Sequence, residues 1–198
     1  MAKEMRWLID FNIYRARLGV IFLIIYTLIF TAYTTVIIEP MVAIFCGYMF
    51  MPVKKNSEFF STLPLGRKSV ILSEFLCGDI LFIITMALSA VFRAADMYFT
   101  GGAAEWAAFG AETATTIAGT FLTMSLVMTM LYPLMIKFPD KQRIFIVLVV
   151  FIAAMAIPIV YLLPYATHVL TVVMAAAGVA VQALGIMITL KVSENEIL

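Results

Sequence analysis

Few side chains in this sequence could take part in covalent or metal chemistry. His168 is the only histidine, and the two cysteines, Cys46 and Cys77, each lie within an apolar stretch. A His-Glu-x-x-His zinc motif needs two histidines, so we expect neither that metal chemistry nor nucleophile activation by a serine–histidine pair. The two cysteines indicate no disulfide framework and no metal site.

The sequence also lacks a phosphate-binding loop. The closest string, Gly66-Arg67-Lys68-Ser69, has no Gly-Lys dipeptide, and Ser61 stands where such a loop has its first glycine. We therefore predict that the chain is not an enzyme and holds no catalytic residue, metal or cofactor. Any ATP hydrolysis coupled to it would take place on a separate subunit.

The side chains that could act inside an apolar environment are one aspartate and four threonines. Asp79 lies about ten residues into an apolar stretch, where an ionised acid is costly unless it faces protein or water. We expect it to face the interior, either lining a translocation path or bonding a threonine hydroxyl or nearby backbone. The threonines share one helical face and could line the same path or bond carbonyls of their own helix; they are Thr113, Thr116, Thr120 and Thr123.

Other polar and small residues have structural interpretations. Glu74 follows the basic residues Arg67 and Lys68 by one to two helical turns, so we expect it to pair with one of them or to reach outward. Glu39 is expected to be solvated at the opposite surface. The many alanines and glycines in residues 175–185 predict close contact between helices.

The composition requires that most of the chain be buried in a membrane. Apolar residues make up 64% of its 198 residues and charged residues 13%, about half the charge of an ordinary soluble domain. At about 20 residues per crossing helix, we predict a single all-α, polytopic transmembrane domain with six spans. Residues 18–53 form two spans with a turn between 31 and 39, and the others lie near 69–92, 113–136, 144–162 and 166–190.

The basic residues orient these spans. With six crossings, every lysine and arginine except Arg93 falls on one side, and an excess of positive charge marks the cytoplasmic side. Both termini are therefore expected in the cytoplasm. Residues 1–17 are expected to form an interfacial helix, or else a solvated tail. Residues 97–112 form a short extracellular segment, in which 101–112 fold as a small helix or re-entrant turn.

The cytoplasmic loop at residues 54–68 has the features of a docking element. Asn56 or Ser57 can cap a short helix, Glu58 suits its first turn, and Pro64 limits its end. About two helical turns then carry three apolar residues, Phe59, Phe60 and Leu63. Two adjacent phenylalanines on such a helix are available to a partner's groove, or both lie in the lipid interface.

Two motifs resemble the short ABC-2 type permeases, which are membrane subunits of bacterial ATP-driven exporters. They are EFFSTLPLGRKSVILS at residues 58–73 and PLMIKFPDKQR at residues 133–143. Together with the N-terminal segment and the six-span layout, the likeness covers the whole chain in order. It is greatest to exporters of amphipathic cytolytic peptides.

The resemblance implies a half-transporter in the bacterial plasma membrane. Two permease chains, as a homo- or heterodimer, join two ATPase subunits that bind ATP and Mg²⁺, and no nucleic acid takes part. By this resemblance, the loop between spans two and three corresponds to the family's coupling helix, which docks in a cleft of the ATPase. The residues so implied are Ser57, Glu58, Phe59, Phe60, Leu63, Pro64, Arg67 and Lys68.

The implied activity is outward movement of an amphipathic peptide or another membrane-partitioning molecule by alternating access. The permease itself performs no covalent chemistry. The alternative is a membrane protein that is not coupled to ATP. It would be a proton-linked carrier that uses Asp79, or a scaffold or immunity protein that binds a cytoplasmic partner.

Overall fold

The computed structural model describes residues 2–31, 66–100, 103–138 and 168–195. This part of the chain is almost entirely helical, which confirms the all-α class for it, and its elements are α1 (Ala2–Thr31), α4 (Arg67–Thr100), α5 (Ala103–Lys137) and α7 (His168–Asn195). The second and fifth predicted spans, and residues 54–65 of the predicted coupling loop, lie outside the described residues.

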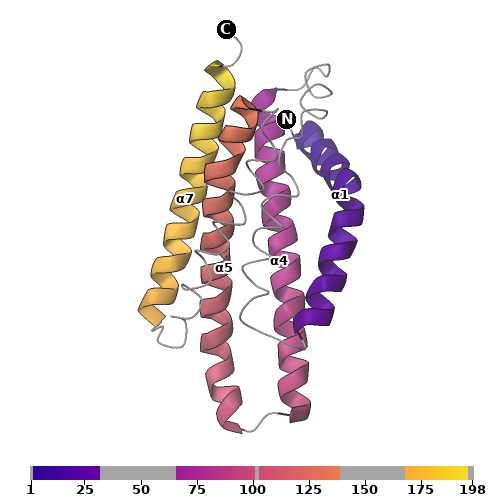
Figure 1. Ribbon diagram of the computed structural model, residues 1–198, viewed down its shortest axis with the longest axis vertical. Coiled ribbons are helices and arrows are strands. Elements are labelled where there is room, and N and C mark those ends of the chain that lie inside the picture. The colour runs from indigo at the N-terminus through magenta and orange to yellow at the C-terminus, as the bar shows by residue number, and fades with distance from the viewer. Residues whose placement is uncertain (1, 32–65, 101–102, 139–167, 196–198) are drawn as a thin grey trace.

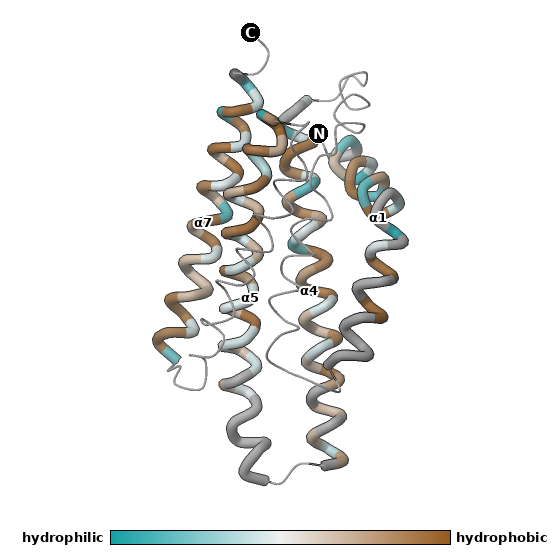
Figure 2. The backbone as a smooth tube through the Cα atoms, viewed as in Figure 1, coloured by the Kyte–Doolittle hydropathy of each residue, from teal (hydrophilic) through white to brown (hydrophobic). Residues whose placement is uncertain are grey.

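Three of these helices are long and apolar enough to cross a membrane. The crossing segments are Lys68–Phe99, Thr113–Lys137 and His168–Glu194, and they coincide with the third, fourth and sixth predicted spans. A hydrocarbon core of about 30 Å needs about 20 helical residues, so each segment is long enough for one crossing. Figure 2 shows hydrophobic residues along most of α4 and α7. These helices indicate a membrane-embedded protein.

The helices are arranged as two closely packed pairs. α5 packs along α7, and α1 packs along α4, whereas α4 makes smaller contacts with α5 and α7. Figure 1 shows that α5 and α7 run in the same direction, and that α4 runs in the opposite direction. α1 changes direction part-way along; its second half follows α4, and its first half crosses the beginning of α4 obliquely.

Two glycines of α7 allow the close approach to α5. A methyl group added at Gly178 would lie 2.6 Å from Cδ1 of Phe121, and one added at Gly185 would lie 3.0 Å from Cα of Thr129. Ordinary carbon–carbon contacts are about 3.5–4.0 Å, so neither position has room for a side chain. The predicted close contact of the small residues in α7 is confirmed for this helix pair.

The tip between α4 and α5 differs from the prediction. α4 continues to Thr100, and α5 begins at Ala103 and runs unbroken to Lys137, so residues 103–112 are neither a separate small helix nor a re-entrant turn. The alanine-rich sequence there favours helix, and extending an existing helix costs far less than starting one. Figure 1 shows the α4–α5 tip reaching past the adjacent end of α7.

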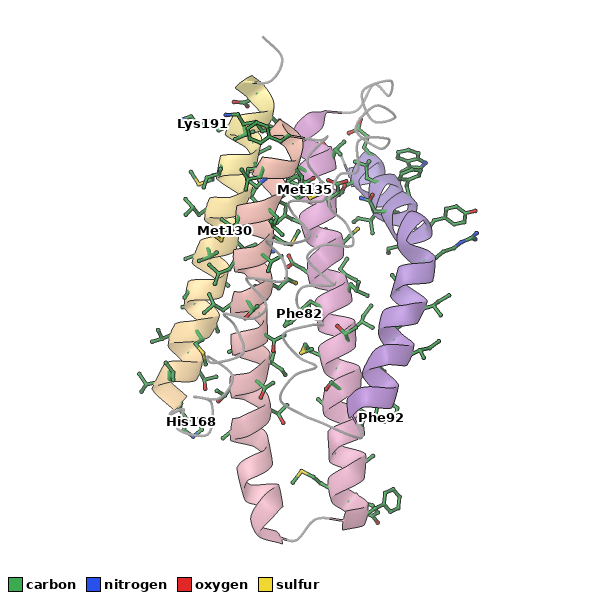
Figure 3. The ribbon with its side chains drawn as sticks, viewed as in Figure 1. Phe82, Phe92, Met130, Met135, His168 and Lys191 are labelled. Carbon is green, nitrogen blue, oxygen red and sulfur yellow. The ribbon has the colours of Figure 1, made fainter. Side chains whose placement is uncertain are left out.

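The basic residues of the described helices gather at one end of the bundle. The start of α1, the start of α4 and the ends of α5 and α7 lie together (Figure 1), and Lys68, Lys137 and Lys191 are near these helix ends. Arg93 lies toward the other end of α4. Figure 3 shows Lys191 and His168 at opposite ends of α7. We refer to the lysine-bearing end as the basic end.

Candidate functional site

A polar cluster joins α4, α5 and α7 within their apolar length. Its centre is Gln182 of α7, whose Nε2 lies 2.6 Å from Oδ1 and 2.7 Å from Oδ2 of Asp79 on α4. A carboxylate only accepts hydrogen bonds, so the amide nitrogen donates to it. Gln182 is 7% exposed. Asp79 therefore faces another helix, and its partner is an amide side chain, not a threonine hydroxyl or nearby backbone.

Ser125 of α5 completes the cluster. Its Oγ lies 3.3 Å from Oε1 of Gln182 and 2.9 Å from the carbonyl oxygen of Phe121, and the residue is fully buried. The serine has one hydroxyl proton for these two acceptors. The glutamine amide thus uses both of its ends, the nitrogen toward α4 and the oxygen toward α5.

Aromatic pairs enclose the cluster along the bundle axis. One turn toward the basic end, the rings of Phe75 and Tyr132 have centroids 5.1 Å apart. One turn away from it, the rings of Phe82 and Phe121 are 5.6 Å apart, and Figure 3 shows Phe82 between α4 and α5. These rings keep the surroundings apolar, which strengthens hydrogen bonds and raises the cost of an unpaired polar group.

The distance of the cluster from the basic end is close to half the thickness of a hydrocarbon core. Asp79 is eleven residues after Lys68, and Ser125 is twelve residues before Lys137. At about 1.5 Å per residue, both lie about 17 Å from the basic end, and half of a hydrocarbon core is about 15 Å. An acidic side chain at this depth faces protein or a polar pathway.

The four predicted threonines are on α5, but the structure does not bring them to Asp79. Thr120 and Thr123 are buried, and Thr123 Oγ1 donates to the carbonyl of Gly119 at 2.9 Å, as expected for bonding within a helix. Thr113 and Thr116 are half-buried. Among the hydrogen bonds of the described helices, none links this threonine face to the Asp79 cluster.

A second polar contact between α5 and α7 lies off that face. Thr115 and Thr171 have hydroxyl oxygens 2.7 Å apart, and Thr115 Oγ1 also donates to the carbonyl of Ala111 at 2.8 Å. The spacing argument selects one threonine stripe and omits Thr115. Its partner on α7 could be found only once the two helices are known to be neighbours.

Of the predicted coupling residues, only Arg67 and Lys68 are described. They form the first turn of α4. Lys68 Nζ lies 3.7 Å from Oε1 of Glu194 near the end of α7, and both side chains are largely exposed. Such a pair adds little stability. Ser57, Glu58, Phe59, Phe60, Leu63 and Pro64 lie outside the described residues.

The predicted outward position of Glu74 is wrong. The residue is 1% exposed, so it does not reach outward. Asn12, fully buried on α1, donates from Nδ2 to Ser73 Oγ at 3.2 Å, and Ser73 Oγ donates to the carbonyl of Val70 at 2.7 Å. The side chain of Lys68 does not pair with Glu74; it reaches toward Glu194 of α7.

Metal chemistry finds no support among the described side chains. No group of three or more histidine, cysteine, aspartate or glutamate residues is placed to hold an ion in that part of the chain. Cys77 is buried, and its Sγ lies 4.0 Å from the carbonyl oxygen of Ile9. It belongs to the contact between α1 and α4.

Comparison of the chain with family models, curated proteins and solved structures found no match. The site is therefore interpreted from its own geometry. Sequence reasoning missed Gln182 and Asn12. Gln182 did carry a signal, because it is the only amide side chain in the apolar stretch of residues 144–190.

Proposed function

We propose that this chain is a permease subunit of an ATP-driven exporter, with six spans and both termini in the cytoplasm of a bacterial cell. The observation that carries the proposal is the Asp79–Gln182–Ser125 cluster, a polar junction of three apolar helices at mid-depth. Buried polar groups at that position are typical of substrate pathways. The two motifs that resemble ABC-2 permeases support ATP hydrolysis by a partner subunit as the energy source.

Helix directions support the six-span count. Consecutive spans must alternate in direction, yet the second half of α1 runs with α4, and α5 runs with α7. One additional crossing between the members of each pair restores the alternation. We assign these crossings to the second predicted span, which ends at residue 53, and to the fifth, near residues 144–162. The lysines and arginines then face the cytoplasm, with Arg93 outside.

The proposed mechanism transmits force along α4. Partner ATPases hydrolyse ATP with Mg²⁺ and close on the coupling segment, residues 57–63, which directly precedes α4. α5 and α7 move together because Gly178 and Gly185 hold them in close contact. Displacement of α4 against that pair would disrupt the Asp79 cluster and open a path for an amphipathic, membrane-partitioning substrate.

Co-purification with an ATPase encoded next to this chain tests the proposal. Replacing Phe59 and Phe60 together by alanine should weaken binding by about 700-fold, because buried aromatic anchors contribute roughly 2 kcal/mol each and about 1.4 kcal/mol corresponds to ten-fold. Phe138→Ala, an exposed phenylalanine after α5 at the same end, is the control. Undiminished binding of the double variant would place the interface elsewhere, and binding of no ATPase would reject the exporter.

A proton-linked carrier is the second candidate, favoured by two acids on one crossing helix. Glu74 is buried, and Asp79, five residues further along α4, is hydrogen-bonded inside the bundle. Proteoliposomes with the chain alone separate the two functions. Substrate movement driven by a pH gradient without any ATPase would favour the carrier, and movement that requires both ATP and the ATPase would favour the exporter.

A further inference from the structure

The first half of α1 has an outer face that combines aromatic and basic side chains. Trp7 and Tyr14 are 45% and 64% exposed, and Arg6 and Arg17 are exposed beside them. The Arg17 guanidinium carbon lies 4.5 Å from the centroid of the Tyr14 ring, within the range of a cation–π contact. The indole of Trp7 stacks on Phe11 at a centroid distance of 5.5 Å.

The opposite face of the same segment is fixed against α4. Leu8 and Asn12 are fully buried, and Asn12 bonds Ser73. Because these contacts hold the inner face, the helix cannot turn Trp7 and Tyr14 into the bundle. Their exposure is a consequence of how α1 packs.

The depth of this segment matches the boundary between headgroups and acyl chains. It contacts α4 at Ser73 and Cys77, which follow Lys68 by five and nine residues, or about 8–14 Å. Interfacial helices bury their apolar face about 5–10 Å into that boundary. Tryptophan and tyrosine concentrate there because one end of each ring system is polar.

We propose that this outer face binds the headgroups of anionic phospholipids in the cytoplasmic leaflet. Residues 2–17 carry four basic side chains against two acidic ones, Glu4 and Asp10, so their charge complements an anionic surface. Arginine suits this role because its planar fork bonds two phosphate oxygens at once. Arg6 and Arg17 bind the phosphates, while Trp7 and Tyr14 lie at the level of the glycerol groups.

The proposal requires only that the protein is embedded in a membrane, and it stands whether or not the chain is an exporter. The test therefore uses the full-length chain without any ATPase. The sequence has two tryptophans, Trp7 and Trp106, so Trp106→Phe leaves Trp7 as the only indole. Its fluorescence then reports which lipid lies next to this face.

The protein is reconstituted in phosphatidylcholine vesicles that contain brominated phosphatidylglycerol or, in parallel, brominated phosphatidylcholine. Bromine quenches Trp7 only on contact, so the two curves give the relative affinity for the anionic lipid. We expect a preference for phosphatidylglycerol of about five-fold per arginine, the typical contribution of one basic residue at an anionic membrane surface.

Arg6→Gln and Arg17→Gln together should remove this preference, whereas Arg6→Lys with Arg17→Lys should keep most of it. Lys191→Gln is the matched control, since Lys191 is exposed near the same end but on α7, and it should change nothing. Equal quenching by both lipids, or an equal effect of the control, would overturn the proposal. Free quenching of Trp7 by aqueous iodide would also overturn the proposal, because this face would then lie in water. So would shielding of Trp7 from both lipid and iodide, because a protein would then cover this face.

Discussion

Gly185 packs closely against Thr129 where α7 meets α5, and this contact allows a quantitative prediction. Gly185→Ala would place a methyl group 3.0 Å from both Cα and Cβ of Thr129 and closer still to its hydroxyl oxygen. The Cα belongs to the backbone and cannot rotate away. The helices must therefore separate locally by roughly 0.5–1 Å to reach an ordinary contact distance.

The expected cost follows from these distances. Overpacking of a close contact costs about 1–3 kcal/mol, and displacing Thr129 breaks its 2.9 Å bond to the carbonyl of Val181, which contributes about 1 kcal/mol. The higher helix propensity of alanine returns up to about 1 kcal/mol. Gly185→Ala should thus destabilise the protein by about 1–3 kcal/mol.

Gly110→Ala is the matched control. Gly110 lies in α5 beyond the crossing segment, and an added methyl group there meets nothing within 4 Å. It should be neutral or stabilise by up to about 1 kcal/mol. Thr129→Ala combined with Gly185→Ala should recover part of the loss, because the hydroxyl and its methyl group are gone while the backbone contact stays.

Denaturant titration in detergent micelles, followed by far-ultraviolet circular dichroism, measures these differences. Gly185→Ala should lower the transition midpoint, and Gly110→Ala should not. If both variants unfold at the wild-type midpoint, α5 and α7 are not in the close contact on which the two-pair architecture depends.

Four further variants test the polar groups and the orientation of the chain. Gln182→Leu removes the amide partner of a half-buried acid and should destabilise by about 1–3 kcal/mol, whereas Asp79→Asn should fold normally but change transport or substrate-stimulated ATP turnover; a normally active Asp79→Asn would make the acid purely structural. Lys68→Gln should shift stability by less than about 1 kcal/mol because its pair with Glu194 is exposed, and a larger loss in the same titration would show that the pair is buried in the assembled protein. A cysteine at position 57, in a chain without the native cysteines, should react with an impermeant reagent only in inverted vesicles, and labelling in intact cells would reverse the proposed orientation.

The helices were predictable from the sequence because each crossing is a long apolar stretch bounded by polar residues. The third span, predicted at residues 69–92, and the fourth, at 113–136, lie within α4 and α5. The extra length of both helices at their shared tip was not predictable from hydropathy. Residues 93–112 are mixed in polarity, and only their alanine content favours helix there.

The site was predictable in part. The cost of a charge at mid-span requires Asp79 to face inward, but it does not name a partner. Gln182 stands out as the only amide in residues 144–190, but its pairing with Asp79 follows only when α4 and α7 are known to be neighbours at the same depth. The burial of Glu74 was not predictable for the same reason, because no local pattern shows what packs against this part of α4.

The contacts of α4 indicate where a conformational change would meet resistance. On one side, buried contacts from Asn12 hold α4 to α1, and through α1 to the face that we assign to lipid. On the other side, the hydrogen bonds described between α4 and α7 are those of Asp79 with Gln182, while the exposed pair of Lys68 and Glu194 adds little. Hydrogen bonds to a charged group contribute about 1.5–3 kcal/mol. Separation of α4 from the α5–α7 pair therefore requires that Asp79 find a new partner at the moment its bond to Gln182 breaks.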